Sequence, residues 1–200
     1  VITTSVKSRD PRHWLFNKKI AGGGILHWLG CHDIDMLRYI TGEEVVSVSA
    51  ICSTLSGEDI DVEDVASVSL ELSNGAIATI HAGYLIQADS KADVLPHIEV
   101  PFAMRGTLGQ IWLESGNGDP KLILQSVAPG WDNVQHHNYS YTMKSSEAYG
   151  GIYGIDFVRQ FFKAAFEKGD PPVTGKDALK VLQITDAAYK SNSIGSAVKI

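Results

Sequence analysis

Apolar and polar residues alternate along much of the first half of the chain, which predicts β-strands. The alternation is clearest over residues 46–52 and 66–72, and it resumes over 76–81 after Asn74-Gly75. An Asn-Gly pair between two alternating segments is a strong signal for a tight hairpin turn. Further strands are expected over residues 1–6, 97–104, 110–114 and 121–127. The pattern therefore predicts a meander-like antiparallel sheet.

Three other segments have the spacing of amphipathic helices. The first runs from about residue 24 to residue 40 and ends at Gly42, since glycine commonly closes helices in the left-handed conformation. The second covers residues 152–168, and the third begins at the T-x-x-D pair Thr174 and Asp177. Together these elements predict an α+β fold, an open, mostly antiparallel β-sheet with helices packed on one face. Its other face is expected to be either solvated or joined to a second sheet in an oligomer.

Three segments lack a clear period. Residues 9–21 are expected to form a structured cover in which Trp14 either lines a site or packs as a hydrophobic clasp. The acidic run 58–64 lacks the glycine and the closing glutamate of a calcium loop, so we expect a solvated loop without a function. Residues 128–151 form a long excursion that suits a subunit contact or the closure of a site.

Composition limits the classes of protein to consider. With 200 residues, 44% of them hydrophobic, the chain can form one domain with a sizeable core. A formal charge of -6 and scattered basic residues argue against a nucleic-acid partner. No apolar run is long enough to span a membrane, and two cysteines are too few for a disulfide framework. We therefore expect a cytoplasmic protein with no nucleic-acid partner and no membrane partner.

Residues 22–35 hold most of the candidate chemistry. The segment opens with three consecutive glycines: Gly22, Gly23 and Gly24. Their lack of side chains would let a ligand approach the backbone. The helix that follows presents Trp28, His32 and Asp35 at spacings of four and three residues, along one stripe. A ligand beside the glycines would therefore face an imidazole.

The pattern alone leaves two interpretations of His32 open. An unperturbed histidine titrates near pH 6.5, which suits a base that removes a proton from an alcohol. His32 also falls on an apolar helical stripe, whose other members are Ile25, Leu29, Met36 and Ile40. A packed core histidine is therefore the alternative, because periodicity does not distinguish burial from catalysis.

Residues 22–35 resemble the motif GGG-x-L-x-D-x-G-x-H-x-x-D of the glucose-fructose oxidoreductase, inositol dehydrogenase and MocA (Gfo/Idh/MocA) family. Later segments match in the same order: the turn at 105–109, the helix entry at 169–179 and the ending at 189–198. Family members pair an N-terminal Rossmann domain for NAD(P) with a C-terminal, largely antiparallel domain that completes the substrate site. The resemblance implies that residues 1–200 are the second domain, for substrate binding and oligomerisation, and a fragment of a longer two-domain protein. The Rossmann signature G-x-G-x-x-G is absent from these residues.

The resemblance also implies an activity. It indicates an oxidoreductase that transfers a hydride between NAD or NADP and the CH-OH group of a sugar, polyol or related compound, with His32 as the base. In the family, a lysine of the Rossmann domain's E-K-P motif completes the proton relay. That motif is missing here, so the chain alone is expected to bind the dinucleotide poorly and to be inactive. A homo-oligomer, dimer or tetramer, formed through the sheet is also expected.

One position departs from the family motif. Trp28 stands four residues before the histidine, where the family commonly has an aspartate that shares the substrate hydroxyl. We expect Trp28 and His27 to form an aromatic wall for the substrate, with Trp14 as a further substrate contact. Gly22, Gly23 and Gly24 are given a supporting role. Asp35 is expected to orient the helix start or the imidazole, and a structural carboxylate is the alternative.

Two competing hypotheses remain. A metal site built from His27, His32, Asp33 and Asp35 is disfavoured, because His27 and His32 are five residues apart and diverge by roughly 140° around a helix. No metal is therefore expected. The second hypothesis is a non-catalytic sugar-binding or oligomerisation module descended from such an enzyme, and it is favoured by Trp28 at the position of the expected acid.

Overall fold

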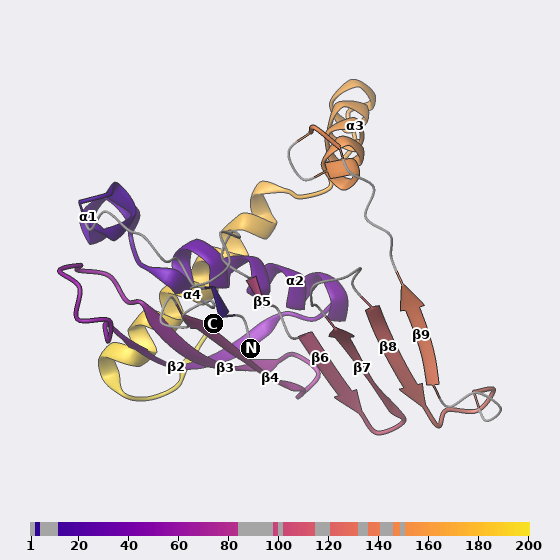
Figure 1. Ribbon diagram of the computed structural model, residues 1–200, viewed down its shortest axis with the longest axis horizontal. Coiled ribbons are helices and arrows are strands. Elements are labelled where there is room, and N and C mark those ends of the chain that lie inside the picture. The colour runs from indigo at the N-terminus through magenta and orange to yellow at the C-terminus, as the bar shows by residue number, and fades with distance from the viewer. Residues whose placement is uncertain are drawn as a thin grey trace, which may run out of the picture. The chain divides into compact units, whose positions relative to one another are not determined.

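The computed structural model describes residues 3–4, 12–83, 98–99, 102–114, 121–131, 136–140, 146–148 and 151–200. They form an α+β structure with antiparallel sheets, as the sequence predicts (Figure 1). The chain divides into two compact units. Unit 1 comprises Val1–Val100 and Leu179–Ile200, and unit 2 comprises Pro101–Ala178.

Unit 1 contains a four-stranded antiparallel sheet in the order β10-β2-β3-β4 (Figure 1). Its strands are β2 (Val45–Ser53), β3 (Val65–Leu72), β4 (Ile77–Gly83) and β10 (Val198–Lys199). The predicted hairpin between β3 and β4 is confirmed, and Gly75 in its turn has a φ of 83°, which glycine adopts without strain. A separate two-stranded ladder pairs β1 (Thr3–Thr4) with β5 (Ile98–Glu99).

The core of unit 1 lies against one face of this sheet. Val48, Val68 and Ile80 are buried on that face, and exposed or half-buried polar residues such as Ser69 alternate with them. The unit contains helices α1 (Lys18–Ala21) and α2 (Cys31–Thr41), and α4 (Gly175–Ile194) from Leu179 onward. It also contains a 3₁₀ turn at Trp14–Phe16 and a π-helical turn at Leu26–Gly30. Ile34 of α2 and Ile184 of α4 join the same buried cluster as the strands. The expected packing of helices on one sheet face is therefore found.

Polar residues near the end of α4 complete the hydrogen bonding of β2. Strand β10 pairs with β2 at Ser47 and Val48, and the Ile200 amide donates to the Val46 oxygen at 3.1 Å. Beyond that short ladder, the Ala50 amide donates to Ser191 Oγ at 3.0 Å and the Cys52 amide donates to Asn192 Oδ1 at 2.8 Å. Two strand amides thereby gain partners that no neighbouring strand provides.

Unit 2 contains a second antiparallel sheet, in the order β6-β7-β8-β9 (Figure 1). Its strands are β6 (Phe102–Gly106), β7 (Gly109–Glu114), β8 (Lys121–Ser126) and β9 (His136–Ser140), and the unit also holds helix α3 (Gly151–Glu167). The predicted single strand over 97–104 is wrong, because β5 and β6 are separate strands in different sheets. The patternless excursion over 128–151 also contains a strand, β9, which the sequence did not predict.

The sequence of β9 explains why it was missed. The strand has the sequence His136-His137-Asn138-Tyr139-Ser140. Polar residues lie on both of its faces, so apolar and polar positions do not alternate. Its pairing with β8 arises from backbone hydrogen bonds at a sheet edge.

Among the described residues, no helix combines the length and the apolar character needed to cross a bilayer.

Candidate functional site

The glycine segment 22–24 is held by a buried carboxylate from a distant loop. Glu63 is 9% exposed. Its side chain accepts hydrogen bonds from the Gly24 amide at 2.8 Å and the Leu26 amide at 3.1 Å, and its backbone oxygen accepts from the Ile25 amide at 3.1 Å. Three consecutive amides at the start of the helical segment are thus bound to one residue. This arrangement satisfies donors that a helix start leaves without intrahelical partners.

Two of the glycines are required by close contacts within the chain. A Cβ atom on Gly24 would lie 1.9 Å from the Glu63 backbone oxygen, and a Cβ atom on Gly23 would lie 2.0 Å from the Tyr189 hydroxyl. Gly22 has a φ of 83°, a left-handed conformation that favours glycine. The space beside Gly23 and Gly24 is therefore filled by the protein itself, rather than by a ligand that approaches the backbone.

Tyr189 of α4 completes this cluster. Its hydroxyl donates to Glu63 Oε1 at 2.7 Å. Burial, together with the neighbouring Glu63 carboxylate, raises the pKa of Tyr189 far above its ordinary value, so the hydroxyl stays a donor. The ring of His27 stacks on the Tyr189 ring with centroids 6.4 Å apart. His27 Nδ1 is buried and has no hydrogen-bond partner among the described residues.

The acidic segment 58–64 is only partly the solvated loop that we predicted. Glu58, Asp59 and Asp61 are exposed, but Glu63 and Asp64 are buried. The Asp64 carboxylate accepts from the amides of residues 55 and 56, both at 2.8 Å. These buried charges are compensated by N–H donors, which is the condition under which carboxylates are tolerated inside a protein. The expectation that the run has no role is wrong for its last two residues.

His32 lies on the solvent-exposed side of α2. The predicted apolar stripe through His32 is wrong, because His32 and Ile40 are exposed while Leu26, Asp33 and Ile34 are buried. The π-helical turn at Leu26–Gly30 explains the change, since an extra residue in one turn rotates the following helix face relative to an α-helical count. The packed core histidine is therefore excluded, and the imidazole is accessible.

The other predicted site residues are placed as follows. Trp28 is 38% exposed and lies in the π-helical turn. Trp14 is 54% exposed and lies beside His13, with ring centroids 5.7 Å apart and the ring planes tilted by 34°. Asp35 lies 3.6 Å from Arg38, whose guanidinium also binds Glu44 at 2.9 Å. The structure thus joins His27 and the glycines in the Glu63–Tyr189 cluster, while His32, Trp14 and Asp35 lie outside that cluster.

Sequence reasoning missed Asp33 as a titratable group. Asp33 is 9% exposed, and its Oδ2 atom has no hydrogen-bond partner among the described residues. Burial raises its pKa to about 7. A carboxyl that titrates near neutral pH, one residue after an accessible histidine, is an unusual feature in a helix. In the sequence, Asp33 resembles any acidic residue in the first turn of a helix, because no local pattern shows which side of the helix is buried.

The described residues offer neither a cluster of metal ligands nor a cradle for a dinucleotide phosphate. They contain no group of three or more His, Cys, Asp or Glu side chains that could hold a metal ion. The glycine segment does not fit a pyrophosphate cradle, because the Gly24 and Leu26 amides are bound to Glu63. Cys31 and Cys52 are both free thiols.

Comparison with known proteins identifies the family. Residues 2–112 match the model for the GFO/IDH/MocA C-terminal domain. The chain therefore belongs to the Gfo/Idh/MocA family. It is 30% identical over 189 residues to an inositol 2-dehydrogenase of Rhizobium meliloti. The aligned region covers 94% of this chain and 53% of that protein. It is 27% identical over 228 residues to a levoglucosan dehydrogenase of Pseudarthrobacter phenanthrenivorans. That aligned region covers 98% of this chain and 56% of the dehydrogenase.

Solved structures show the same fold. A levoglucosan dehydrogenase in complex with NADH and levoglucosan matches with a TM-score of 0.80 and 26% identity, covering 100% of this chain and 57% of that one. An aldose-aldose oxidoreductase from Caulobacter crescentus matches with a TM-score of 0.76 and 23% identity, covering 100% and 54%. The chain spans about half the length of the curated relatives it matches.

Proposed function

We propose that residues 1–200 are the substrate-binding and catalytic half of an NAD(P)-dependent dehydrogenase that oxidises a CH-OH group of a sugar, polyol or related compound. The observation that carries the proposal is the accessible imidazole of His32, on the helix that follows the anchored glycine segment. The names of the relatives, an inositol dehydrogenase and a levoglucosan dehydrogenase, support the substrate class.

His32 accepts the hydroxyl proton in this proposal. An alcohol gives up a hydride only as its hydroxyl loses a proton, and a neutral imidazole is suited to receive that proton. The nicotinamide, NAD or NADP, accepts the hydride and is bound mainly by an N-terminal domain outside this sequence. We assign the glycine segment no phosphate contacts, because the Gly24 amide binds Glu63 and the Gly22 amide binds the Lys18 backbone oxygen.

His27, Trp28 and Trp14 form the substrate contacts in this proposal. Trp28 and Trp14 are both substantially exposed, so their rings are available to a ligand. An aromatic face suits the C–H face of a cyclic polyol or sugar. Gly22, Gly23, Gly24 and Asp35 support the helix that bears His32. We also propose that the protein works in the cytoplasm as a homo-oligomer formed through its sheet, and that it is inactive without the N-terminal domain.

A second candidate function is a non-catalytic sugar-binding or oligomerisation module. Trp28 favours it, because the aspartate that the family commonly places there is missing. The two functions differ in a simple way: the dehydrogenase turns substrate over, whereas the module only binds it.

The test uses the longer protein with its N-terminal domain. A panel of polyols and sugar derivatives is assayed with NAD and with NADP by absorbance of the reduced cofactor. We expect turnover on at least one substrate, and His32→Gln should lower kcat by about 100-fold, the usual contribution of a general base. His81→Gln, which changes another exposed histidine in unit 1, is the matched control and should leave kcat unchanged.

Two outcomes would contradict the proposal. Normal kcat in the His32→Gln enzyme would remove His32 from the reaction. Absence of turnover across the panel, combined with saturable sugar binding by calorimetry, would establish the non-catalytic module instead.

A further inference from the structure

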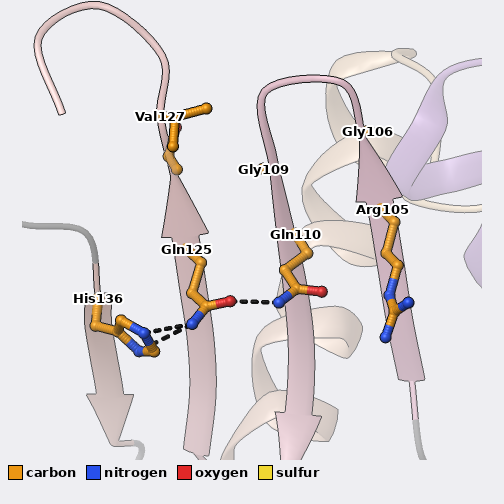
Figure 2. A pocket seen from close by; sticks show the side chains of 8 residues that line it. Arg105, Gly106, Gly109, Gln110, Gln125, Val127 and His136 are labelled. Carbon is orange, nitrogen blue, oxygen red and sulfur yellow. Dashed lines mark hydrogen bonds between the residues drawn. The ribbon is translucent and has the colours of Figure 1, made fainter. Parts of the chain in front are cut away.

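The sheet of unit 2 carries a row of polar side chains across all four of its strands. Register pairs place Arg105 of β6 opposite Gln110 of β7, Gln110 opposite Gln125 of β8, and Gln125 opposite His136 of β9. Directly opposed residues in an antiparallel sheet project from the same face. Figure 2 shows the side chains of Gln110, Gln125 and His136 in line, with Arg105 on the adjoining strand. We call these four residues the polar ladder.

Two glutamine amides form a directional chain within the ladder. Gln110 Nε2 donates to Gln125 Oε1, and Gln125 Nε2 approaches both ring nitrogens of His136, with Nδ1 at 3.4 Å (Figure 2). The ladder lines a pocket of about 380 Å³, which Gly106 and Gly109 leave without side chains at one end. None of the described residues that line this pocket is acidic.

The hydrogen-bonding capacity of the ladder depends on the charge of His136. Each glutamine offers one acceptor end and one donor end, so a chain of two presents an acceptor at one end only. An arginine only donates, and a protonated histidine also only donates. With neutral His136, Gln125 can donate to the ring and the chain leaves its acceptor end toward β6, where Arg105 lies. With protonated His136, both ends of the pair of glutamine amides face groups that only donate, Arg105 and the imidazolium. The pair has one acceptor end, so one of these donors has no acceptor within the ladder.

The charge within the ladder is positive, because Arg105 of β6 belongs to it. Farther along the same face, Lys121 of β8 is paired in register with Glu114 of β7, so this row adds one charge of each sign. On its own strand, His136 shares its face with Asn138 and Ser140, which do not titrate near neutral pH. The whole chain carries a formal charge of -6, so the positive charge of the ladder stands out against an acidic protein.

We propose that the polar ladder is a binding site for a small oxyanion, such as a free carboxylate, sulfate or phosphate group, and that protonation of His136 strengthens the binding. The anion provides the acceptor that the chain of two amides lacks, and it balances the charges of Arg105 and the imidazolium. The proposal lies outside the dehydrogenase function and does not depend on it.

The test measures sulfate binding to the full chain at constant ionic strength. Sulfate keeps the same charge at about pH 5.5 and about pH 8, on either side of the ordinary titration of histidine. Binding is followed by NMR through the side-chain amide resonances of Gln110 and Gln125. We expect the association constant to be at least about 10-fold larger at the lower pH, since one added charge–oxyanion bond contributes at least about that factor.

Variants separate the ladder from general charge effects. His136→Asn should abolish the pH dependence, and Arg105→Gln should weaken sulfate binding about 10-fold at the lower pH. His137→Asn is the matched control, because residue 137 is the next residue of β9 and projects from the opposite face. It should behave as the unchanged chain does.

The proposal is overturned by any of three results. These are no amide shifts at either pH, equal affinity at the two pH values, or an equal loss of pH dependence in His137→Asn. The comparison of the two pH values requires no variant, and Arg105 and His136 are exposed, so the test does not depend on a substitution that disrupts the fold.

Discussion

The Glu63 carboxylate and the Tyr189 hydroxyl are joined by a 2.7 Å hydrogen bond, although 126 residues separate them in the sequence. The same carboxylate binds the Gly24 and Leu26 amides. One buried acid therefore links the final helix, the acidic loop and the start of the segment that leads to His32. The position of the candidate site in unit 1 depends on this link.

Replacing Glu63 should destabilise the chain measurably. Glu63→Gln keeps one acceptor oxygen where the structure has three donors directed at two oxygens, so at least one buried donor loses its partner. We expect a loss of about 2 kcal/mol in the free energy of unfolding, against about 1 kcal/mol for Tyr189→Phe. Urea denaturation of both variants and of the double variant measures the coupling. Additive effects of the two substitutions would contradict the linked cluster.

Alanine at the two packed glycines should be costly, and the two costs should differ. Gly24→Ala places a Cβ atom against the Glu63 backbone, which cannot move aside, whereas Gly23→Ala meets the end of the Tyr189 side chain. We expect losses of about 3 kcal/mol or more for Gly24→Ala and about 1–3 kcal/mol for Gly23→Ala. Thermal unfolding measures both. Gly175→Ala is the control, because no atom lies within 4 Å of its added Cβ, and it should be neutral or slightly stabilising.

Asp33 should make stability depend on pH. Burial raises its pKa to about 7, so the folded chain holds a proton that the unfolded chain releases above its ordinary pKa of about 4. Stability is therefore lost as the pH rises from about 4 to about 7. Asp33→Asn removes this dependence and should exceed the unchanged chain in stability at pH 8, by up to about 4 kcal/mol. Urea titrations across this range test it, with the exposed Asp59→Asn as control; an unchanged pH profile in Asp33→Asn would refute the assignment.

Trp28 should affect both substrate choice and folding. Its side chain is 38% exposed, so the rest of the ring is buried, and Trp28→Asp should lower the free energy of unfolding by about 1–3 kcal/mol through lost apolar burial. The aspartate restores the side chain that the family motif carries four residues before the histidine. In the longer protein we expect the ratio of kcat/KM values between polyols and cyclic sugars to change. An unchanged ratio would place Trp28 outside the substrate site.

Local signals in the sequence were sufficient for most of the secondary structure. Asn74-Gly75 located the hairpin between β3 and β4, since few residue pairs adopt that turn. Gly42 ended α2 in the left-handed conformation, with a φ of 67°, as its position after the apolar pattern indicated. The helices α3 and α4 also lie where the amphipathic period predicted them. Each of these features depends on neighbours within a few residues.

The environment of each candidate site residue required the tertiary structure. The sequence placed His32 on an apolar stripe, but the π-helical turn before α2 leaves it exposed and directs Asp33 inward. It also gave no reason to separate Glu63 from the exposed acids beside it. That difference arises from the Gly24 and Leu26 amides and the Tyr189 hydroxyl, which come from distant parts of the chain.

The sequence by itself therefore determined the family, the α+β class, the order of most strands and helices, and the segment that carries the candidate chemistry. Those properties follow from periodicity, turn residues and motif spacing, which act over short distances along the chain. Only the tertiary structure determined which carboxylates are buried, which face His32 occupies and how the ladder of unit 2 assembles. Burial and hydrogen-bond partnership are properties of residues brought together by folding, so no local pattern encodes them.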